Sequence, residues 1–345
     1  MRVLSAAEAI SPAISRTKLV LFTPFRFGRT WKLAVTSYLG MASMFFMPFP
    51  LIYFLYLPAM HRHWLQVAYS VALVLATGIF CVLFFLMTRL EFAFFDILIN
   101  RGVLVAPAWR KYGAQTFRWG FFKMVIGAPI ALLIGFPFYR LMRPLMNFKV
   151  GAPPPPNFPF PFALFLYAFF AMMLGMLLLL LIGSLLSDFV LPSLALEDVP
   201  VGEAFRRFFL LVKQEPGAML GFTCLKAVLG LVGYYAVMLA AEIVLIIAII
   251  VLALAGLLIG WMLHKAGVPW MVLKVVAIVC AIPCYVGFAF YLLPMVIGSF
   301  VTFLQAWGVY FLGGRYPLLG EALDQSTPPP PQWPVPPAYP PPPAI

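Results

Sequence analysis

The sequence is poor in charge. Only 10% of its 345 residues are Asp, Glu, Lys or Arg, whereas 64% are hydrophobic, and the mean hydropathy is +1.01. Soluble globular proteins carry about a quarter of their residues as charged side chains. The composition therefore excludes an ordinary soluble domain and predicts an integral membrane protein.

Residue types that support catalysis and metal binding are also scarce. The chain has 3 His, and its 4 Cys lie inside apolar segments. No Gly-rich phosphate loop, HExxH helix or serine nucleophile elbow occurs. We therefore predict no catalytic residue, no metal site, no cofactor and no disulfide framework, and we expect a protein that is not an enzyme.

The charge that is present is mostly positive, with a formal net charge of +12. Lys and Arg are interleaved with aromatic residues between long apolar runs rather than gathered on a polar domain. Such a pattern is typical of segments beside anionic lipid headgroups. It predicts the lipid bilayer as the partner and argues against nucleic acid.

Long apolar runs are abundant, and crossing the hydrocarbon of a bilayer takes about 20 residues. One run, 217–263, is about twice that length and contains no turn signal, so one long helix and two spans meeting near Glu242 are alternatives. Counting it as one helix, the sequence predicts an all-α, polytopic transmembrane bundle of about six spans. The runs are 31–57, 64–87, 119–141, 161–186, 217–263 and 270–293.

One pattern recurs about every 100 residues: an aromatic-apolar run, followed twelve residues later by Ala and an aromatic residue. Self-similarity at a nearly fixed period indicates a repeated unit, here three pseudo-repeated helical hairpins, and it favours a single helix over 217–263. The three copies are 94–96 with 108–109, 189–192 with 204–205, and 291–294 with 306–307.

The repeat divides the chain. A basic amphipathic lead, expected to lie in the headgroup layer, precedes three hairpins, each followed by an amphipathic interfacial arm, and a Pro-rich tail. With six spans, sixteen Lys and Arg fall on the side of the termini and arms and five on the other. Because these residues concentrate in cytoplasmic loops, we predict a multi-pass protein of the plasma (inner) membrane with both termini cytoplasmic. The segments are 1–30, 31–118, 119–216, 217–316 and 317–345.

Two of the ionisable residues within the predicted spans are candidate functional residues, because charge inside a membrane is costly. Glu242 stands in a wholly apolar region, and Lys226 lies sixteen residues earlier. At 1.5 Å per residue they are about 24 Å apart along one helix and cannot pair. Glu242 is compatible with a transport path or with a structural position.

Four cations of the arms, each following an Ala-aromatic pair, could bind lipid phosphates, although cations that only set the topology would occupy the same places. In the tail, Pro336, Pro337 and Tyr339 belong to a Pro-Pro-x-Tyr sequence of the kind read by aromatic grooves. A solvated low-complexity end is the alternative. The four candidate headgroup cations are Arg110, Lys111, Arg206 and Arg207.

Two glycine pairs, 217 with 221 and 256 with 260, have the small-x3-small spacing that lets helices approach closely. We predict packing within the chain at these positions rather than dimerisation.

The sequences 189–192 (FVLP), 196–198 (LED) and 204–207 (AFRR) resemble a group of bacterial multi-span domains. The group includes the membrane domain attached to some glycerophosphodiester phosphodiesterases, together with uncharacterised relatives. The likeness covers most of residues 9–315. It implies a bundle of repeated helical hairpins and no activity, since the phosphodiesterase domain of the fused proteins has no counterpart here.

The sequence therefore favours a non-enzymatic membrane scaffold or accessory protein whose Pro-rich tail recruits a cytosolic partner. The alternative is a transporter or permease component with Glu242 on the transport path. A transporter should show a polar cavity that reaches the bilayer midplane from one side, whereas a scaffold should be packed throughout.

Overall fold

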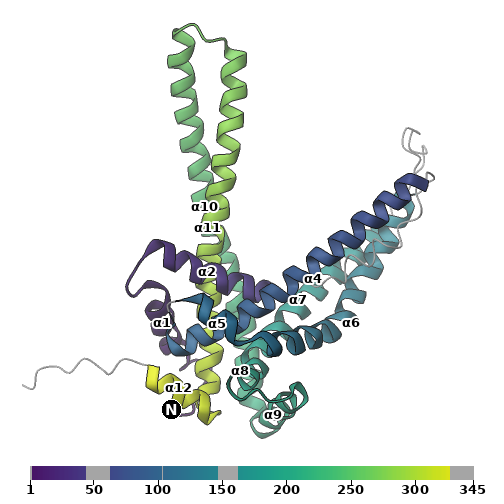
Figure 1. The fold of residues 1–345 in the computed structure, drawn as a ribbon, viewed down its shortest axis with the longest axis vertical. Coiled ribbons are helices and arrows are strands. Elements are labelled where there is room, and N and C mark those ends of the chain that lie inside the picture. The colour runs from purple at the N-terminus through teal and green to yellow at the C-terminus, as the bar shows by residue number, and fades with distance from the viewer. Residues whose placement is uncertain (1, 44–62, 103, 147–161, 327–345) are drawn as a thin grey trace, which may run out of the picture.

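The structure is a computed structural model that describes residues 2–43, 63–102, 104–146 and 162–326 (Figure 1). Every regular element in those residues is a helix. In chain order they are α1 (Ile10–Thr17), η1 (Lys18–Phe22), α2 (Phe27–Ala42), α4 (His63–Asn100), α5 (Val105–Lys111), α6 (Gly113–Met146), α7 (Phe162–Leu185), η3 (Leu186–Val190), α8 (Leu191–Glu197), α9 (Val201–Gln214), α10 (Pro216–Lys265), α11 (Trp270–Gly313) and α12 (Pro317–Ser326).

Five stretches of helix in the described chain are long and apolar enough to cross a membrane. Helices suit the bilayer because each backbone N–H and C=O finds its partner within the segment. A sixth predicted span, 31–57, is not among them: α2 has only 16 residues, and positions 44–57 lie outside the described residues. The five are Val71–Asn100, Gly113–Pro137, Phe162–Glu197, Pro216–Lys265 and Val279–Gly313.

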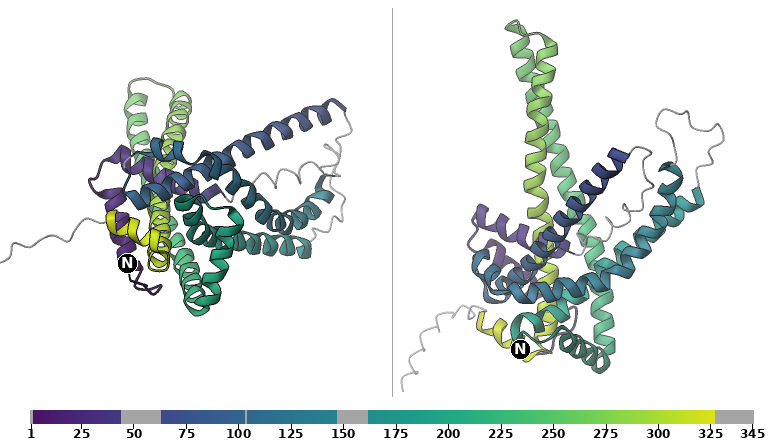
Figure 2. Two further views of the ribbon diagram at one scale, coloured as in Figure 1. Left: turned by 60° about the horizontal axis from the view of Figure 1, so that its bottom comes forward. Right: turned by 45° about the vertical axis from the view of Figure 1, so that its right-hand side comes forward.

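The long helices form two arms that diverge from a common base (Figures 1 and 2). We call α10 with α11 the hairpin arm, and α4, α6 and α7 the three-helix arm. The base contains the short helices α1, α5, α8, α9 and α12. Helix α2 packs against both α11 and α4, so it connects the two arms above the base.

Helix α10 confirms the single-helix interpretation of 217–263, since it runs unbroken for 50 residues. At 1.5 Å per residue it is about 75 Å long, more than twice the hydrocarbon thickness of about 30 Å. It must therefore be strongly tilted in a bilayer or extend beyond it.

The best-packed part of the molecule is the base, where aromatic residues of three segments meet. Phe222 of α10 stacks on Phe311 of α11 at 4.2 Å between ring centroids. Phe189 of η3 meets both rings edge-on, at 5.6 and 6.1 Å. The hairpin arm is packed less tightly than the base, since its outer residues, such as Val251 and Phe290, are more than half exposed.

The N-terminal lead packs into this base through α1, and its place in the headgroup layer stays a prediction. Arg16 is only 1% exposed. Its Nε donates to the carbonyl of Leu98 at 2.8 Å, and another guanidinium nitrogen donates to Ser326 Oγ at 2.7 Å. The guanidinium thus satisfies a carbonyl at the C-terminal end of α4, where a cation is favourable.

Close helix crossings occur at glycines other than the predicted pairs. A Cβ added at Gly298 of α11 would lie 2.0 Å from the carbonyl oxygen of Ala34 in α2, so any side chain there would separate the helices. By contrast, an added Cβ at Gly217, Gly221 or Gly256 would meet no described atom within 4 Å. The predicted packing of those pairs within the chain is therefore wrong at these three positions.

A polar cavity with two buried ion pairs

The first ion pair joins α4 to α6. The ammonium of Lys123 contacts Glu91 Oε2 and also donates to Ser43 Oγ at 3.0 Å. The side chains of Lys123 and Glu91 are 1% and 4% exposed. Lys123 Nζ also lies 5.5 Å from the ring centre of Trp119, within the range of a cation–π interaction.

The second ion pair joins η3 to α10. The ammonium of Lys226 contacts Asp188 Oδ2, to which Ser184 Oγ also donates at 3.3 Å. The side chains of Lys226 and Asp188 are 10% and 3% exposed. Lys226 Nζ lies 5.6 Å from the ring centre of Phe222. Each lysine therefore has a carboxylate partner and, four residues earlier on its helix, an aromatic ring.

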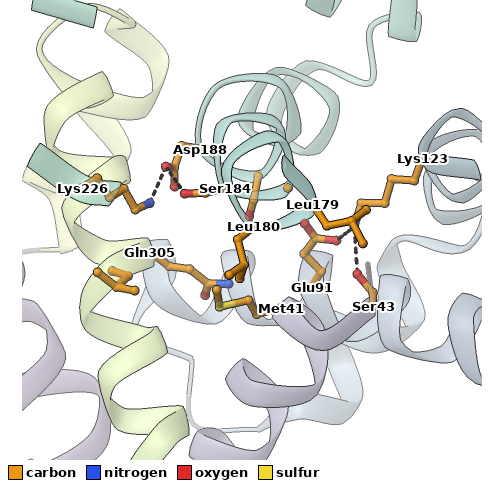
Figure 3. Close-up of a pocket in the computed structure, with 13 residues that line it drawn as sticks. Met41, Ser43, Glu91, Lys123, Leu179, Leu180, Ser184, Asp188, Lys226 and Gln305 are labelled. Carbon is orange, nitrogen blue, oxygen red and sulfur yellow. Dashed lines mark hydrogen bonds and ion pairs between the residues drawn. The ribbon is translucent and has the colours of Figure 1, made fainter. Parts of the chain in front are cut away.

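Both pairs face one cavity of about 40 Å³ (Figure 3). A smaller cavity of about 10 Å³ shares Glu91, Ser187, Asp188 and Gln305 with it. One water needs about 10–15 Å³ of such volume together with polar partners, so the larger cavity has room for roughly three waters. The larger cavity is lined by Met41, Ser43, Glu91, Lys123, Leu179, Leu180, Gly183, Ser184, Ser187, Asp188, Lys226, Leu304 and Gln305.

Asp188 reaches the cavity because of two local features. It lies within η3, a π-helical turn, which holds one residue more per turn than the α-helix before it. It also lies against Gly308 of α11, where an added Cβ would be 2.3 Å from Asp188 Oδ1. Any other residue at 308 would displace the carboxylate.

The two candidate residues of the predicted spans lie in different environments. Lys226 lines the cavity, paired with Asp188. Glu242 is exposed on the hairpin arm and does not line the cavity. The structure therefore separates them, as their spacing along the helix requires, and Glu242 is not part of this site.

Sequence reasoning missed Glu91, Lys123, Asp188 and Gln305. Lys123 is one of the sixteen Lys and Arg predicted on the side of the termini and arms, yet it is buried within the candidate span Gly113–Pro137. One signal was available: an aromatic residue precedes both Lys123 and Lys226 by four positions. The acidic partners carry no comparable signature, because they come from other helices.

Three of the four candidate headgroup cations bind carboxylates of the chain itself. Lys111 contacts Asp96 at 2.9 Å. Arg206 contacts Glu203 at 2.8 Å and holds the pKa of that carboxyl below its ordinary value through its hydrogen bonds. Arg207 contacts both Glu197, at 2.7 Å, and Glu203, at 3.3 Å.

Arg110, the fourth of these cations, is exposed and has no ion pair in the part of the chain that the structure describes. The tail residues Pro336, Pro337 and Tyr339 lie outside that part. Within it, no group of three His, Cys, Asp or Glu side chains could hold a metal ion.

The described chain is all-helical, and its five candidate spans, with charged residues buried between helices, fit a membrane-embedded protein. The chain belongs to the Family of unknown function (DUF7544), whose model matches residues 4–321. This match shows no link to the membrane domain of glycerophosphodiester phosphodiesterases. No curated protein and no solved structure matches the chain.

Proposed function

We propose that this protein is a non-enzymatic membrane scaffold or accessory protein. The observation that carries the proposal is the size of the polar cavity, about 40 Å³. Sites for small organic molecules usually measure about 300–1,000 Å³. In this conformation, the space between the ion pairs accommodates water or a small ion but no organic substrate.

The proposal includes six spans in three pseudo-repeated hairpins, in the plasma (inner) membrane, with both termini cytoplasmic. Equivalent contacts at successive hairpins support the repeat. An acidic residue near the end of one hairpin meets a lysine of the next: Glu91 with Lys123, then Asp188 with Lys226. The resemblance to the phosphodiesterase-associated membrane domain is part of this proposal, since it implies the same hairpin bundle.

The third junction, between α11 and α2, contains a stack of aromatic rings. Trp31 stacks on Tyr291 at 5.0 Å between ring centroids, and its indole nitrogen donates to the Tyr291 carbonyl at 3.1 Å. Phe27, four residues before Trp31, also stacks on Tyr291 at 5.0 Å. As at the other two junctions, an aromatic residue stands four positions before the residue that makes the contact. The contact itself is a stack of rings, whereas the other two junctions have an ion pair.

Attachment to anionic headgroups through the short amphipathic helices α5 and α9 is the second part of the proposal. Helix α9 exposes Phe209 and Leu210 between the cations Arg206 and Lys213, which is typical of a helix lying in the membrane interface. Arg110 on α5 is exposed as well. The third part is recruitment of a cytosolic partner by the segment that contains Pro336, Pro337 and Tyr339.

Topology reporters test the hairpin scheme. Tags inserted after Lys111 and after Lys213 should be accessible from the cytoplasmic side only. Tags on opposite sides of the membrane would disprove three hairpins that enter from one face.

Liposome binding tests the headgroup role. Replacing Arg110 and Arg206 by Gln should weaken binding of the protein to anionic liposomes. Replacing Lys265, at the far end of α10, should leave this binding unchanged. Unchanged binding of the first variant would remove lipid recognition from the proposal.

A transporter is the second candidate, and the charged cavity within the spans favours it. Because Asp188 and Lys226 line the cavity and Glu242 does not, the proposed transport path passes Asp188 and Lys226 instead of Glu242. Reconstituted protein that moves an ion in proteoliposomes, with the flux lost on Asp188→Asn but kept on Glu242→Gln, would establish this candidate and overturn the scaffold. The scaffold proposal expects no flux in either case.

A further inference from the structure

The two ion pairs differ in what they connect. Glu91 and Lys123 both belong to the three-helix arm. Asp188 follows α7 of that arm, whereas Lys226 belongs to α10 of the hairpin arm. The Asp188–Lys226 contact is therefore a direct polar connection between the arms, beside the cavity (Figure 3).

The cavity contains more polar groups than the described protein atoms can satisfy. Lys226 has three N–H donors, and one of them has a protein partner, Asp188. The side chains of Gln305 and Ser187 line the cavity and make no hydrogen bond to another described residue. Since unsatisfied polar groups are costly inside a protein, water must complete these bonds.

Four ionisable side chains face this space. They are Glu91 from α4, Lys123 from α6, Asp188 from η3 and Lys226 from α10. The other polar side chains lining the cavity, Ser43, Ser184, Ser187 and Gln305, do not titrate. Two carboxylates facing one small cavity repel each other, and one proton removes that repulsion.

We propose that the cavity is a hydrated proton-binding site whose occupancy controls the connection between the two arms. A proton from the aqueous phase reaches Asp188 Oδ2 through the cavity water, and the carboxylate becomes a carboxylic acid. Lys226 keeps its proton. The charge-assisted contact between Asp188 and Lys226 weakens, because ammonium then faces a neutral group, and the arms gain freedom to separate. Gln305 and Ser187 hold the water along which the proton travels.

Spin-label distances measured on the full chain in lipid nanodiscs test this inference. One label replaces Tyr235 on α10 and the other replaces Phe170 on α7, both exposed positions, after the four native cysteines have been replaced by serine or alanine. As the pH falls, the distance distribution should shift to longer values through one midpoint. Asp188→Asn, which mimics the neutral acid, should give the low-pH distribution at every pH.

The matched control is Glu242→Gln, because Glu242 lies on the same helix as Lys226 and outside the cavity. This variant should keep the full shift and its midpoint. Where Asp188→Asn does not fold, Asp188→Asn combined with Lys226→Met leaves no charge unpaired and should also give a distribution independent of pH.

Three outcomes would overturn the inference. They are a wild-type distribution that stays constant over the pH range in which the protein is folded, a shift retained in the Asp188 variants, and a shift caused by replacing sodium with choline at constant pH. The last would assign the site to a metal cation. None of these depends on whether the protein is a scaffold, because ion flux is not measured.

Discussion

Glu91 and Lys123 join two helices of one arm, whereas Asp188 and Lys226 join one arm to the other. The first pair has an extra hydrogen-bond acceptor, Ser43 Oγ, to which Lys123 donates, and it is almost inaccessible. The second pair includes the more exposed lysine, next to cavity-lining groups that need water. The same kind of ion pair thus packs two helices within one arm in the first place and, under our proposal, forms a proton-responsive contact between the arms in the second.

The largest expected effect comes from removing Lys123. Lys123→Met leaves the Glu91 carboxylate buried without its cation, which typically costs about 3–5 kcal/mol of stability. Lys226→Met should cost less, because Lys226 is the more exposed lysine and Ser184 still donates to Asp188. Denaturant unfolding in detergent micelles measures both, with the exposed Arg110→Met as a control that should change little. Equal losses for the two lysines would contradict the difference drawn between the pairs.

A smaller effect is expected at the crossing of α2 and α11. Gly298→Ala places a Cβ against the Ala34 carbonyl and should destabilise the protein by about 1–3 kcal/mol through overpacking. Gly256→Ala, where nothing lies within 4 Å, is the matched control and should be neutral or slightly stabilising. Thermal unfolding in the same lipid compares them. A neutral Gly298 variant would mean that this crossing is looser than the structure shows.

Removing both charges of the inter-arm pair should cost less than removing one. Asp188→Asn with Lys226→Met leaves no buried charge unpaired, and such replacements are often neutral. The double variant should therefore regain most of the stability lost in Lys226→Met. Unfolding measurements on the two single variants and the double variant give the coupling energy directly. A coupling energy near zero would show that the two side chains act independently.

The smallest effect is expected at Glu242. It is exposed and far from the cavity, so Glu242→Gln should change stability by no more than about 0.5 kcal/mol. The same variant tests the sequence-based transport hypothesis in a flux assay. A large loss of stability would indicate a contact of Glu242 with a partner or a second copy of the chain.

Much of the helical organisation is predictable from the sequence. The run 217–263 has no internal turn signal and forms one helix, and each predicted span from 64 onward overlaps one of the five candidate helices, with different ends. The candidate site was predicted only at Lys226. Glu91 and Lys123 are 32 residues apart, and Asp188 and Lys226 are 38 apart, so their pairing depends on how helices cross. The π-helical turn that carries Asp188 also shifts the direction of the side chains along the helix, and nothing in the composition predicts such a turn.

The sequence by itself determined that the protein is helical and lies in a membrane, because apolar runs of this length must satisfy their own backbone hydrogen bonds in a solvent that offers none. Only the tertiary structure decided which of the few charges meet. Whether a buried lysine has a partner depends on the register and crossing point of two separate helices. A glycine such as Gly298 or Gly308, which admits a neighbour within contact distance, sets that crossing as much as the charges do.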